Sequence, residues 1–220
     1  GLKLDQLERI RATGSVVLDS NDPLVIELGR RRRREWCGQL DLIVSERPDH
    51  LGRSSTTTDQ LIDYAVDLVE GDTLLWTHVT SPLVDHHVYE RAIADYGQSG
   101  PARHDSLMAV TRIGGFVWSP RGPVNYPTLG LRWPRTQDLQ PMYEVNSAIF
   151  MVSRDIAAMR RDRIGSRPLF WELDKTTAVD VDDEEDFRLA EFLYRQVDEG
   201  ADDASDRGAV AVQRTALEHA

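Results

Sequence analysis

The chain has 220 residues, a length that fits one good-sized domain with a substantial hydrophobic core. Its 37 acidic and 26 basic residues give a net charge of −11, which disfavours generic binding to nucleic acid because the long-range field repels phosphate. No apolar run reaches the roughly 18 residues of a membrane-spanning helix, and no secretory signal is recognisable. Since the single cysteine, Cys37, can form no internal disulfide, these features predict a cytoplasmic protein without membrane or nucleic-acid partners.

Short apolar runs alternate with amphipathic stretches along most of the chain. The expected strands are 15–20, 40–46, 72–79, 104–113 and 144–155. The expected helices are 22–31, 56–69 and 85–97, with Asp22 and Asp85 as N-caps and Gly97 as a stop. This alternation predicts an α/β fold with a Rossmann-like, mostly parallel sheet flanked by helices. In such sheets, ligands bind beyond the carboxyl ends of the strands.

The alternation breaks between residues 114 and 143, where Gly, Pro and aromatic residues are frequent. Long ordered segments of this kind in compact domains are often functional. We therefore expect a projecting, β-rich arm over about 114–170. The remainder of 1–197 forms the α/β domain.

After 144–155, a second helix–strand passage is expected to lead to "TTAVDVD" (176–182), where the alternation at 178–182 is typical of a strand, and then to a helix over 184–197. The apolar face of that helix is expected to hold Phe187, Ala190, Tyr194 and Val197. Beyond it, 198–220 has low hydrophobicity at first and no clear packing face, and we expect it to be a flexible acidic tail.

An acidic stretch fills six of the seven positions from Asp180 to Asp186. On a strand, Asp180 and Asp182 share a face, and two neighbouring carboxylates repel unless a cation or a proton lies between them. Hard cations prefer oxygen ligands, and Mg²⁺ often takes one or two carboxylates together with substrate phosphates. By composition alone, a metal site and an acidic surface are equally good interpretations of this pair. The other acidic residues most simply complement the positive N-terminus of the following helix.

Six segments, taken in order, resemble the acylneuraminate cytidylyltransferase family, which includes the CMP-sialic acid synthetases. They are "SVVLDSND", "SERPDHLGRSSTTTDQLIDYAV", "LLWTHVTSPLV", "HDSLMAVTRIGGFVW", "RTQDLQPMYEVNSAIFMVSRD" and "RIGSRPLFWELDKTTAVDVDDEEDFRLAEF". The resemblance covers about residues 15 to 195. It implies that the anomeric hydroxyl of an acidic, nonulosonic sugar attacks the α-phosphate of CTP, so that pyrophosphate leaves and a CMP-sugar forms.

The resemblance also implies roles for particular residues. It makes Asp180 and Asp182 the ligands of a catalytic Mg²⁺, with Mn²⁺ as an alternative. Nucleotide contacts are expected from Arg47, Thr56 and Ser81. For the Ser/Thr cluster at Thr56, an ordinary helix cap is an equally good interpretation.

Sugar contacts are expected from His78, Arg135, Gln137 and Asn146. Arg135 and Gln137 resemble the pair that meets the sugar's carboxylate, which places Arg135 among the catalytic residues as well; a guanidinium fork suits that group. His78 stands where the family usually has glutamine, which leaves the identity of the sugar open. If these residues do not contact a sugar, His78 and Asn146 have a structural role at strand ends, and Arg135 and Gln137 are surface residues of the arm.

Two further expectations concern the whole assembly. The family dimerises through its arm, so a homodimer is expected. The family also opens with a strand and a basic, Gly-containing loop that cradles the phosphates of CTP, and no such loop precedes Ser15. Either the given sequence lacks that segment or the protein does. In the second case the alternative is a non-catalytic nucleotide- or sugar-binding homologue; within the enzymatic class, an eight-carbon ulosonic acid or a phosphonate is the alternative acceptor.

Overall fold

The computed structural model describes residues 1–127 and 132–196, so the expected tail lies outside the described residues. Its helices are α1 Leu2–Glu8, α2 Pro23–Glu35, α3 Thr58–Leu68, α4 His86–Ser99 and α5 Arg154–Arg160, with 3₁₀ turns η1 Asp49–Leu51 and η2 Thr136–Asp138. Its strands are β1 Ser15–Ser20, β2 Asp41–Glu46, β3 Thr73–Trp76, β4 Ser106–Ile113, β5 Trp118–Ser119, β6 Gly122–Pro123, β7 Met142–Ser153 and β8 Pro168–Glu172. Residues 184–196 are also helical.

The strands form a parallel pair, β1–β2, and a four-stranded sheet in the order β3-β7-β4-β8. Strands β4 and β8 are parallel, and β7 is antiparallel to both β3 and β4. Within the four-stranded sheet, β3, β4 and β8 therefore run in one direction and β7 runs in the other. This arrangement confirms the α/β class, but the four-stranded sheet is mixed: β4 and β8 are parallel, whereas β7 is antiparallel to both of its neighbours.

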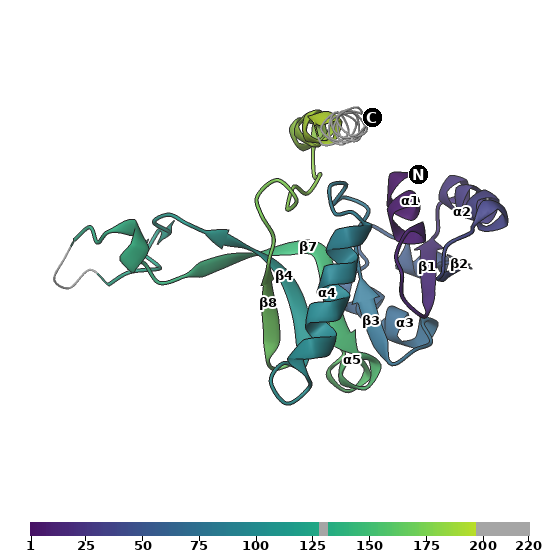
Figure 1. Ribbon diagram of the computed structural model, residues 1–220, viewed down its shortest axis with the longest axis horizontal. Helices are drawn as coiled ribbons and strands as arrows, with labels where there is room; N and C mark the ends of the chain where they lie inside the picture. Colours follow the sequence, from purple (N-terminus) through teal and green to yellow (C-terminus); the bar gives the residue numbers. More distant parts are fainter. Residues whose placement is uncertain (128–131, 197–220) are drawn as a thin grey trace, which may run out of the picture.

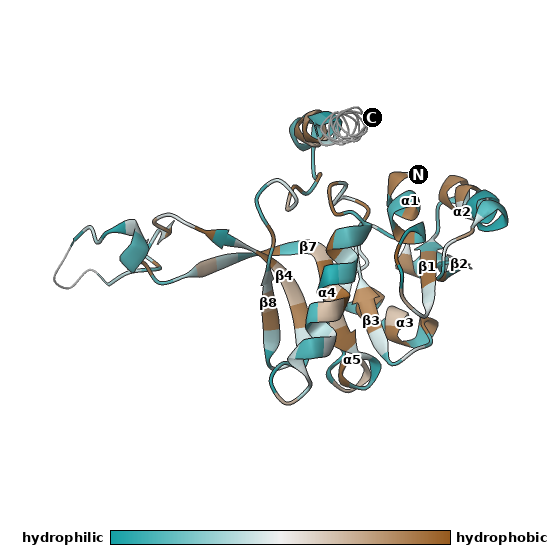
Figure 2. Cartoon of the chain, in the orientation of Figure 1, coloured by the Kyte–Doolittle hydropathy of each residue, from teal (hydrophilic) through white to brown (hydrophobic). Residues whose placement is uncertain are grey.

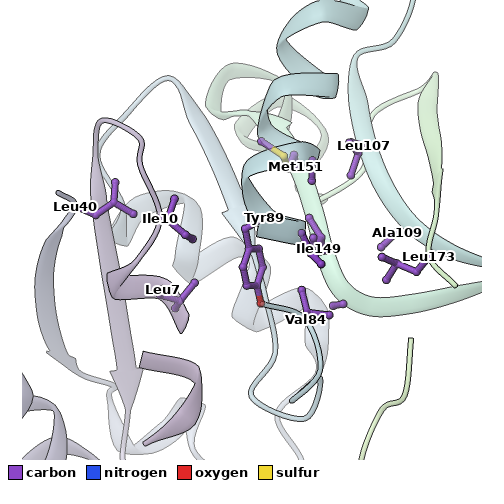
Figure 3. Packing of buried hydrophobic residues seen from close by; sticks show 13 residues of the cluster. Leu7, Ile10, Leu40, Val84, Tyr89, Leu107, Ala109, Ile149, Met151 and Leu173 are labelled. Atoms are coloured by element: carbon purple, nitrogen blue, oxygen red, sulfur yellow. The ribbon is translucent and has the colours of Figure 1, made fainter. Parts of the chain in front are cut away.

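The main core lies between the four-stranded sheet and α4, which crosses one face of that sheet (Figure 1). Tyr89 and Ala92 of α4 and Leu107 of β4 are fully buried there. Leu7 and Ile10, at the end of α1, close the cluster at the side of the β1–β2 pair (Figure 3). Figure 2 shows the hydrophobic residues concentrated on the strands, whereas the second half of α2 is hydrophilic.

Local signals explain why most helices begin where the sequence predicts. The side chain of Asp22 accepts a hydrogen bond from the N–H of Leu24 at the start of α2, and Asp85 does the same for Val88 at the start of α4. The predicted stop of α4 at Gly97 is wrong. The helix continues to Ser99 and ends at Gly100, whose φ of 67° suits a glycine.

Two other expectations need correction. The segment 176–182 is a turn followed by irregular chain, and the last described strand is β8. The projecting arm is also shorter than expected: residues 114–127 and 132–141 extend away from the body, while β7, α5 and β8 lie within it (Figure 1). β7 belongs to the body because its 12 residues pair with both β3 and β4. In the described part of the chain, no helix is long and apolar enough to span a membrane.

Candidate active site

Three chain segments meet at the edge of the four-stranded sheet where β3 and β8 end. The N–H of Val181, in the loop after β8, donates a 2.8 Å hydrogen bond to the carbonyl oxygen of Thr80, in the loop after β3. The amide of Asn146, on β7, donates a 2.6 Å hydrogen bond to the carbonyl oxygen of Ala178. Parallel strands end at the same edge of a sheet, so these contacts gather polar side chains at the place where α/β folds bind ligands.

The imidazole of His78 is held at this edge by two donors. The indole Nε1 of Trp76 lies 3.0 Å from His78 Nε2, and Nη1 of Arg163 lies 3.2 Å from the same atom. Because Nε2 accepts from both, we assign the ring proton to Nδ1. Burial and the guanidinium of Arg163 lower the pKa of His78, while the charge of Asp180 acts in the opposite direction. His78 is therefore a neutral donor at this edge of the sheet.

Arg163 lies flat against aromatic side chains from the sheet. Its guanidinium carbon is 3.8 Å from the ring centroid of Phe150 and 5.7 Å from that of Trp76. Burial lowers the pKa of Arg163, with the adjacent Asp162 acting in the opposite direction. Within 1–127 and 132–196, Arg163 forms no ion pair, so the cation is half-buried without a carboxylate partner.

Asp180 is half-buried, and its Oδ1 atom is shielded from solvent without a hydrogen-bond partner in the described part of the chain. An unpartnered buried carboxylate oxygen is costly unless a cation or a donor from a ligand meets it. Asp182 is exposed two residues later, and its N–H donates to Oδ2 of Asp186. The chain is irregular at 180–182, so the strand face that the two carboxylates were expected to share is not formed. Each carboxylate is a hard oxygen donor of the kind that suits a divalent ion that keeps most of its other ligands from water or substrate. No cluster of three or more potential ligands forms among the described residues.

The rest of the acidic stretch has the helix-start role favoured from the sequence. Oδ1 of Asp183 accepts hydrogen bonds from the N–H groups of Glu185 and Asp186, at 2.8 and 3.0 Å. These bonds satisfy donors at the start of the helix 184–196. On that helix Ala190 is buried, but Phe187 and Tyr194 of the predicted apolar face are exposed; Val197 lies outside the described residues.

The candidate nucleotide residues have different surroundings. Arg47 follows β2 and pairs with Asp19 of β1, with 2.6 Å between Nε and Oδ2. The hydroxyl of Tyr64 donates to the other oxygen of Asp19, so Arg47 is held rigidly at the end of the β1–β2 pair. Thr56 donates to the carbonyl of His50, and the α3 cap is its neighbour Thr57.

Ser81 is fully buried, and its hydroxyl has no hydrogen-bond partner in the part of the chain that the structure describes. Its carbonyl oxygen accepts a 2.8 Å hydrogen bond from Nζ of Lys3. The side chain therefore faces the interior, and this structure does not present it to a nucleotide.

Arg135 and Gln137 lie on the arm, at η2. Arg135 pairs with Asp138 at 2.9 Å and its side chain is 72% exposed. Gln137 lines a shallow cleft of about 360 Å³ at the base of the arm, together with Arg112 and Lys175. Across the described ranges, no hydrogen bond or ion pair joins Arg135 or Gln137 to the group around His78 and Asp180.

Sequence reasoning missed Arg163, Trp76 and Lys3. Arg163 stands in the run "RRDRIGSR", where four arginines look alike. Only the path of the loop between α5 and β8 brings one of them onto Phe150. The position of Trp76 in the second half of the predicted strand 72–79 was a signal in the sequence that an aromatic side chain lies at this edge of the sheet.

The fold is that of a known structure. The chain matches the solved structure of a CMP:2-keto-3-deoxy-manno-octonic acid synthetase complexed with CTP with a TM-score of 0.55, at 13% identity, over 90% of this chain and 87% of that one. The chain therefore shares the fold of that synthetase.

Sequence comparison is more specific. The chain is 26% identical over 164 residues to an N-acylneuraminate cytidylyltransferase of Streptococcus agalactiae serotype V, and similarly to that of serotype III. It is 32% identical over 60 residues, 27% of the chain and 26% of that protein, to the post-translational flagellin modification protein B of Campylobacter coli. The match to the serotype V protein covers 70% of this chain but only 38% of the length of that relative. No protein-family model matches. The chain is thus a homologue of the cytidylyltransferases, as the six ordered segments predicted.

Proposed function

We propose that the protein is a CTP-dependent cytidylyltransferase that activates an acidic, nonulosonic sugar to its CMP-sugar. The observation that carries the proposal is Oδ1 of Asp180, which is buried without a hydrogen-bond partner among the described residues. It lies in a loop that is hydrogen-bonded to the loop of His78, at the edge of the sheet where β3 and β8 end. The sequence relatives named N-acylneuraminate cytidylyltransferase support the same substrate class.

In the proposed reaction, the oxygen of the anomeric hydroxyl forms a bond to the α-phosphorus of CTP. The bond from that phosphorus to the bridging oxygen of the β-phosphate breaks, its electron pair leaves with pyrophosphate, and the hydroxyl proton is lost to solvent. Little covalent work falls to the protein, so positioning and charge neutralisation dominate.

Asp180 and Asp182 would hold Mg²⁺, or Mn²⁺ in its place. When bound, the ion neutralises charge on the phosphates and polarises the attacking hydroxyl. Asn146 fixes the loop that carries both carboxylates through its bond to Ala178. His78 offers Nδ1–H to a substrate oxygen, as the amide of a glutamine would at this position.

Arg47 and Thr56 are proposed to contact the nucleotide from the carboxyl end of the β1–β2 pair. Arg47 is already oriented by Asp19, so it can present its remaining N–H groups without further ordering. The free, exposed thiol of Cys37 suits a reducing compartment, and we place the activity in the cytoplasm.

We also propose that two copies associate through their arms. The arm carries four neighbouring aromatic rings, of Phe116, Trp118, Tyr126 and Trp133. Trp118 and Trp133 are 57% and 64% exposed although they stack on each other. Large exposed aromatic groups are typical of the centres of protein interfaces. In a dimer, the arm of one copy could carry Arg135 and Gln137 to the site of the other.

The test is pyrophosphate release from CTP by the full-length protein with Mg²⁺ and a panel of nonulosonic acids, an eight-carbon ulosonic acid and a phosphonate. We expect release with at least one acid and none with neutral sugars. Calorimetric titration with CTP runs in parallel. CTP binding without release from any acceptor would favour the non-catalytic homologue, and the absence of both would remove the proposal.

A further inference from the structure

We infer that Arg163, rather than Arg135 of the same chain, binds the carboxylate of the sugar. This inference rests on the proposed function and assigns one step of substrate recognition within it. Its basis is a half-buried guanidinium that has no anionic partner in the described chain and that contacts His78 at the edge of the sheet where the loop of Asp180 also lies.

The binding capacity of Arg163 is largely unused. A guanidinium has five N–H donors, and Arg163 uses one of its nitrogens, Nη1, towards Nε2 of His78. The other candidate arginines are occupied by carboxylates, Arg47 by Asp19 and Arg135 by Asp138. A carboxylate that reaches Arg163 therefore gains a charge-assisted pair without displacing an existing one.

The aromatic side chains fix the orientation of the guanidinium. Phe150 lies beneath its face at 3.8 Å and Trp76 lies further along at 5.7 Å. With the face covered, the edge with its N–H groups is left for a planar partner, and a carboxylate matches that fork with two parallel hydrogen bonds. The rings also exclude water from one side, which strengthens the attraction to an anion.

The chemistry of the acceptor requires its carboxylate binder to be close to the metal ligands. In an ulosonic acid, the carboxylate and the attacking hydroxyl are attached to the same anomeric carbon. The hydroxyl must approach the α-phosphate near the ion held by Asp180. The N–H of Val181, the residue after Asp180, donates a 2.8 Å hydrogen bond to the carbonyl oxygen of Thr80, two residues after His78. Nε2 of His78 lies 3.2 Å from Nη1 of Arg163, so Arg163 lies at the same edge of the sheet as the loop that carries Asp180.

His78 completes the recognition site. Its Nε2 is engaged by Trp76 and Arg163, so its Nδ1–H is free to donate to an oxygen of the same substrate. A neutral donor and a cation, placed beside a carboxylate that would hold a metal ion, select an acceptor that carries both a hydroxyl and an anion. A neutral sugar would leave Arg163 half-buried and unpaired, which disfavours its binding.

The experiment compares Arg163→Gln, Arg163→Lys and Arg135→Gln in the full-length protein. Arg160→Gln is the matched control, because Arg160 carries the same charge three residues away but is exposed and bonds only to Ser166. We expect Arg163→Gln to lower kcat/KM for the acid sugar by about 100-fold or more. The KM for CTP should stay within about threefold, because the nucleotide does not use this group. Arg163→Lys should recover part of the loss, and Arg160→Gln should match the wild-type protein.

A second substrate separates recognition from a structural role. The wild-type protein should prefer the acid sugar to its carboxamide, and Arg163→Gln should lose most of that preference. If the wild-type protein is active and Arg163→Gln keeps both its kcat/KM and its preference, the inference is wrong while the proposed function stands. A loss confined to Arg135→Gln would likewise overturn it. If the wild-type protein binds neither CTP nor any acid sugar in calorimetry, the proposed function fails, and the inference fails with it.

Discussion

The ammonium group of Lys3 lies 2.8 Å from the carbonyl oxygen of Ser81, so the first helix of the chain is tied to the loop that leaves β3. The same group donates to the carbonyl of Val84 and to the hydroxyl of Tyr89, at 3.1 and 3.0 Å. All three donors of the ammonium are thus used, and the side chain is buried. Lys3, which is 75 or more positions away in the sequence, therefore holds the loop that carries His78 and Thr80 in place through these hydrogen bonds.

The burial of Lys3 predicts an unusual dependence of stability on pH. Burial lowers the pKa of Lys3 to about 7, with the charge of Asp85 acting in the opposite direction. An unfolded lysine titrates near 10.4, so between about pH 7 and 10 the unfolded chain binds more protons than the folded one. The contribution of Lys3 to the free energy of unfolding should therefore rise with pH in this window, by up to about 1.4 kcal/mol per unit.

Urea unfolding at pH 7, 8 and 9 would measure this effect as the difference between the wild-type protein and Lys3→Met. The free energy of unfolding of the wild-type protein minus that of Lys3→Met should become more positive as pH increases. Lys175→Met, at the exposed second lysine, serves as the control and should give a curve parallel to the wild-type one. Parallel curves for Lys3→Met as well would contradict the lowered pKa.

Asp180→Asn should separate catalysis from stability. Because Oδ1 of Asp180 is buried without a partner, removing its charge should leave the free energy of unfolding of the metal-free protein unchanged or slightly higher. Pyrophosphate release should fall by about 1,000-fold, since the main protein ligand of the proposed ion is lost.

The measurement pairs activity with thermal unfolding at increasing Mg²⁺ in the presence of CTP. Asp180→Asn should lose the Mg²⁺-dependent increase in Tm. Glu184→Gln is the control within the same acidic stretch, because Glu184 is exposed and pairs only with Arg188. Equal losses in the two variants would point to an unspecific effect of net charge.

His78→Gln should be tolerated better than His78→Leu. A glutamine can accept from Trp76 and Arg163 through its carbonyl and still offer an N–H, whereas leucine leaves both donors unpaired. We expect KM for the sugar to change by less than about tenfold in His78→Gln and kcat/KM to fall by about 100-fold or more in His78→Leu. Steady-state kinetics at fixed CTP would check this, and the reverse order would exclude the donor role of His78.

Thr57→Ala and Thr56→Ala should affect different properties. Thr57 forms a capping box with Gln60 at the start of α3, so its loss should lower the free energy of unfolding by about 1 kcal/mol. Among the described residues, the hydroxyl of Thr56 bonds to the carbonyl of His50 alone, and its loss should change stability little but raise KM for CTP. Urea unfolding and CTP kinetics on both variants test this pair, and an unchanged KM in Thr56→Ala would remove Thr56 from the nucleotide site.

The proposed dimer predicts that Trp118→Ala combined with Trp133→Ala weakens self-association. The two rings stack 6.1 Å apart on the arm and are mostly exposed, so the body of the subunit does not depend on them. Light scattering across a dilution series should show a dimer for the wild-type protein and a monomer for the double variant at the same concentration. A wild-type monomer at every concentration would contradict the assembly.

The sequence by itself determined the elements and their class, because local signals specify them. Asp22 and Asp85 cap their helices, and the apolar runs at 15–20 and 104–113 form β1 and β4. The sequence failed where two local signals competed: alternation at 178–182 suggested a strand, but Asp174 accepts hydrogen bonds from Thr176 and Thr177 and folds the preceding chain into a turn.

Only the tertiary structure decided which side chains meet. Asp180, His78 and Arg163 are separated by up to 102 residues and come together because β3 and β8 end at one edge and the loop after α5 folds over Phe150. Lys3 and Ser81 meet because α1 packs against α4 and the loop before it. Charge and spacing along a chain do not encode such contacts, since they depend on the sum of many distant packing interactions. A sequence pattern can therefore identify Asp180 as a candidate metal ligand. Only the fold shows that one of its oxygens is buried without a hydrogen-bond partner among the described residues.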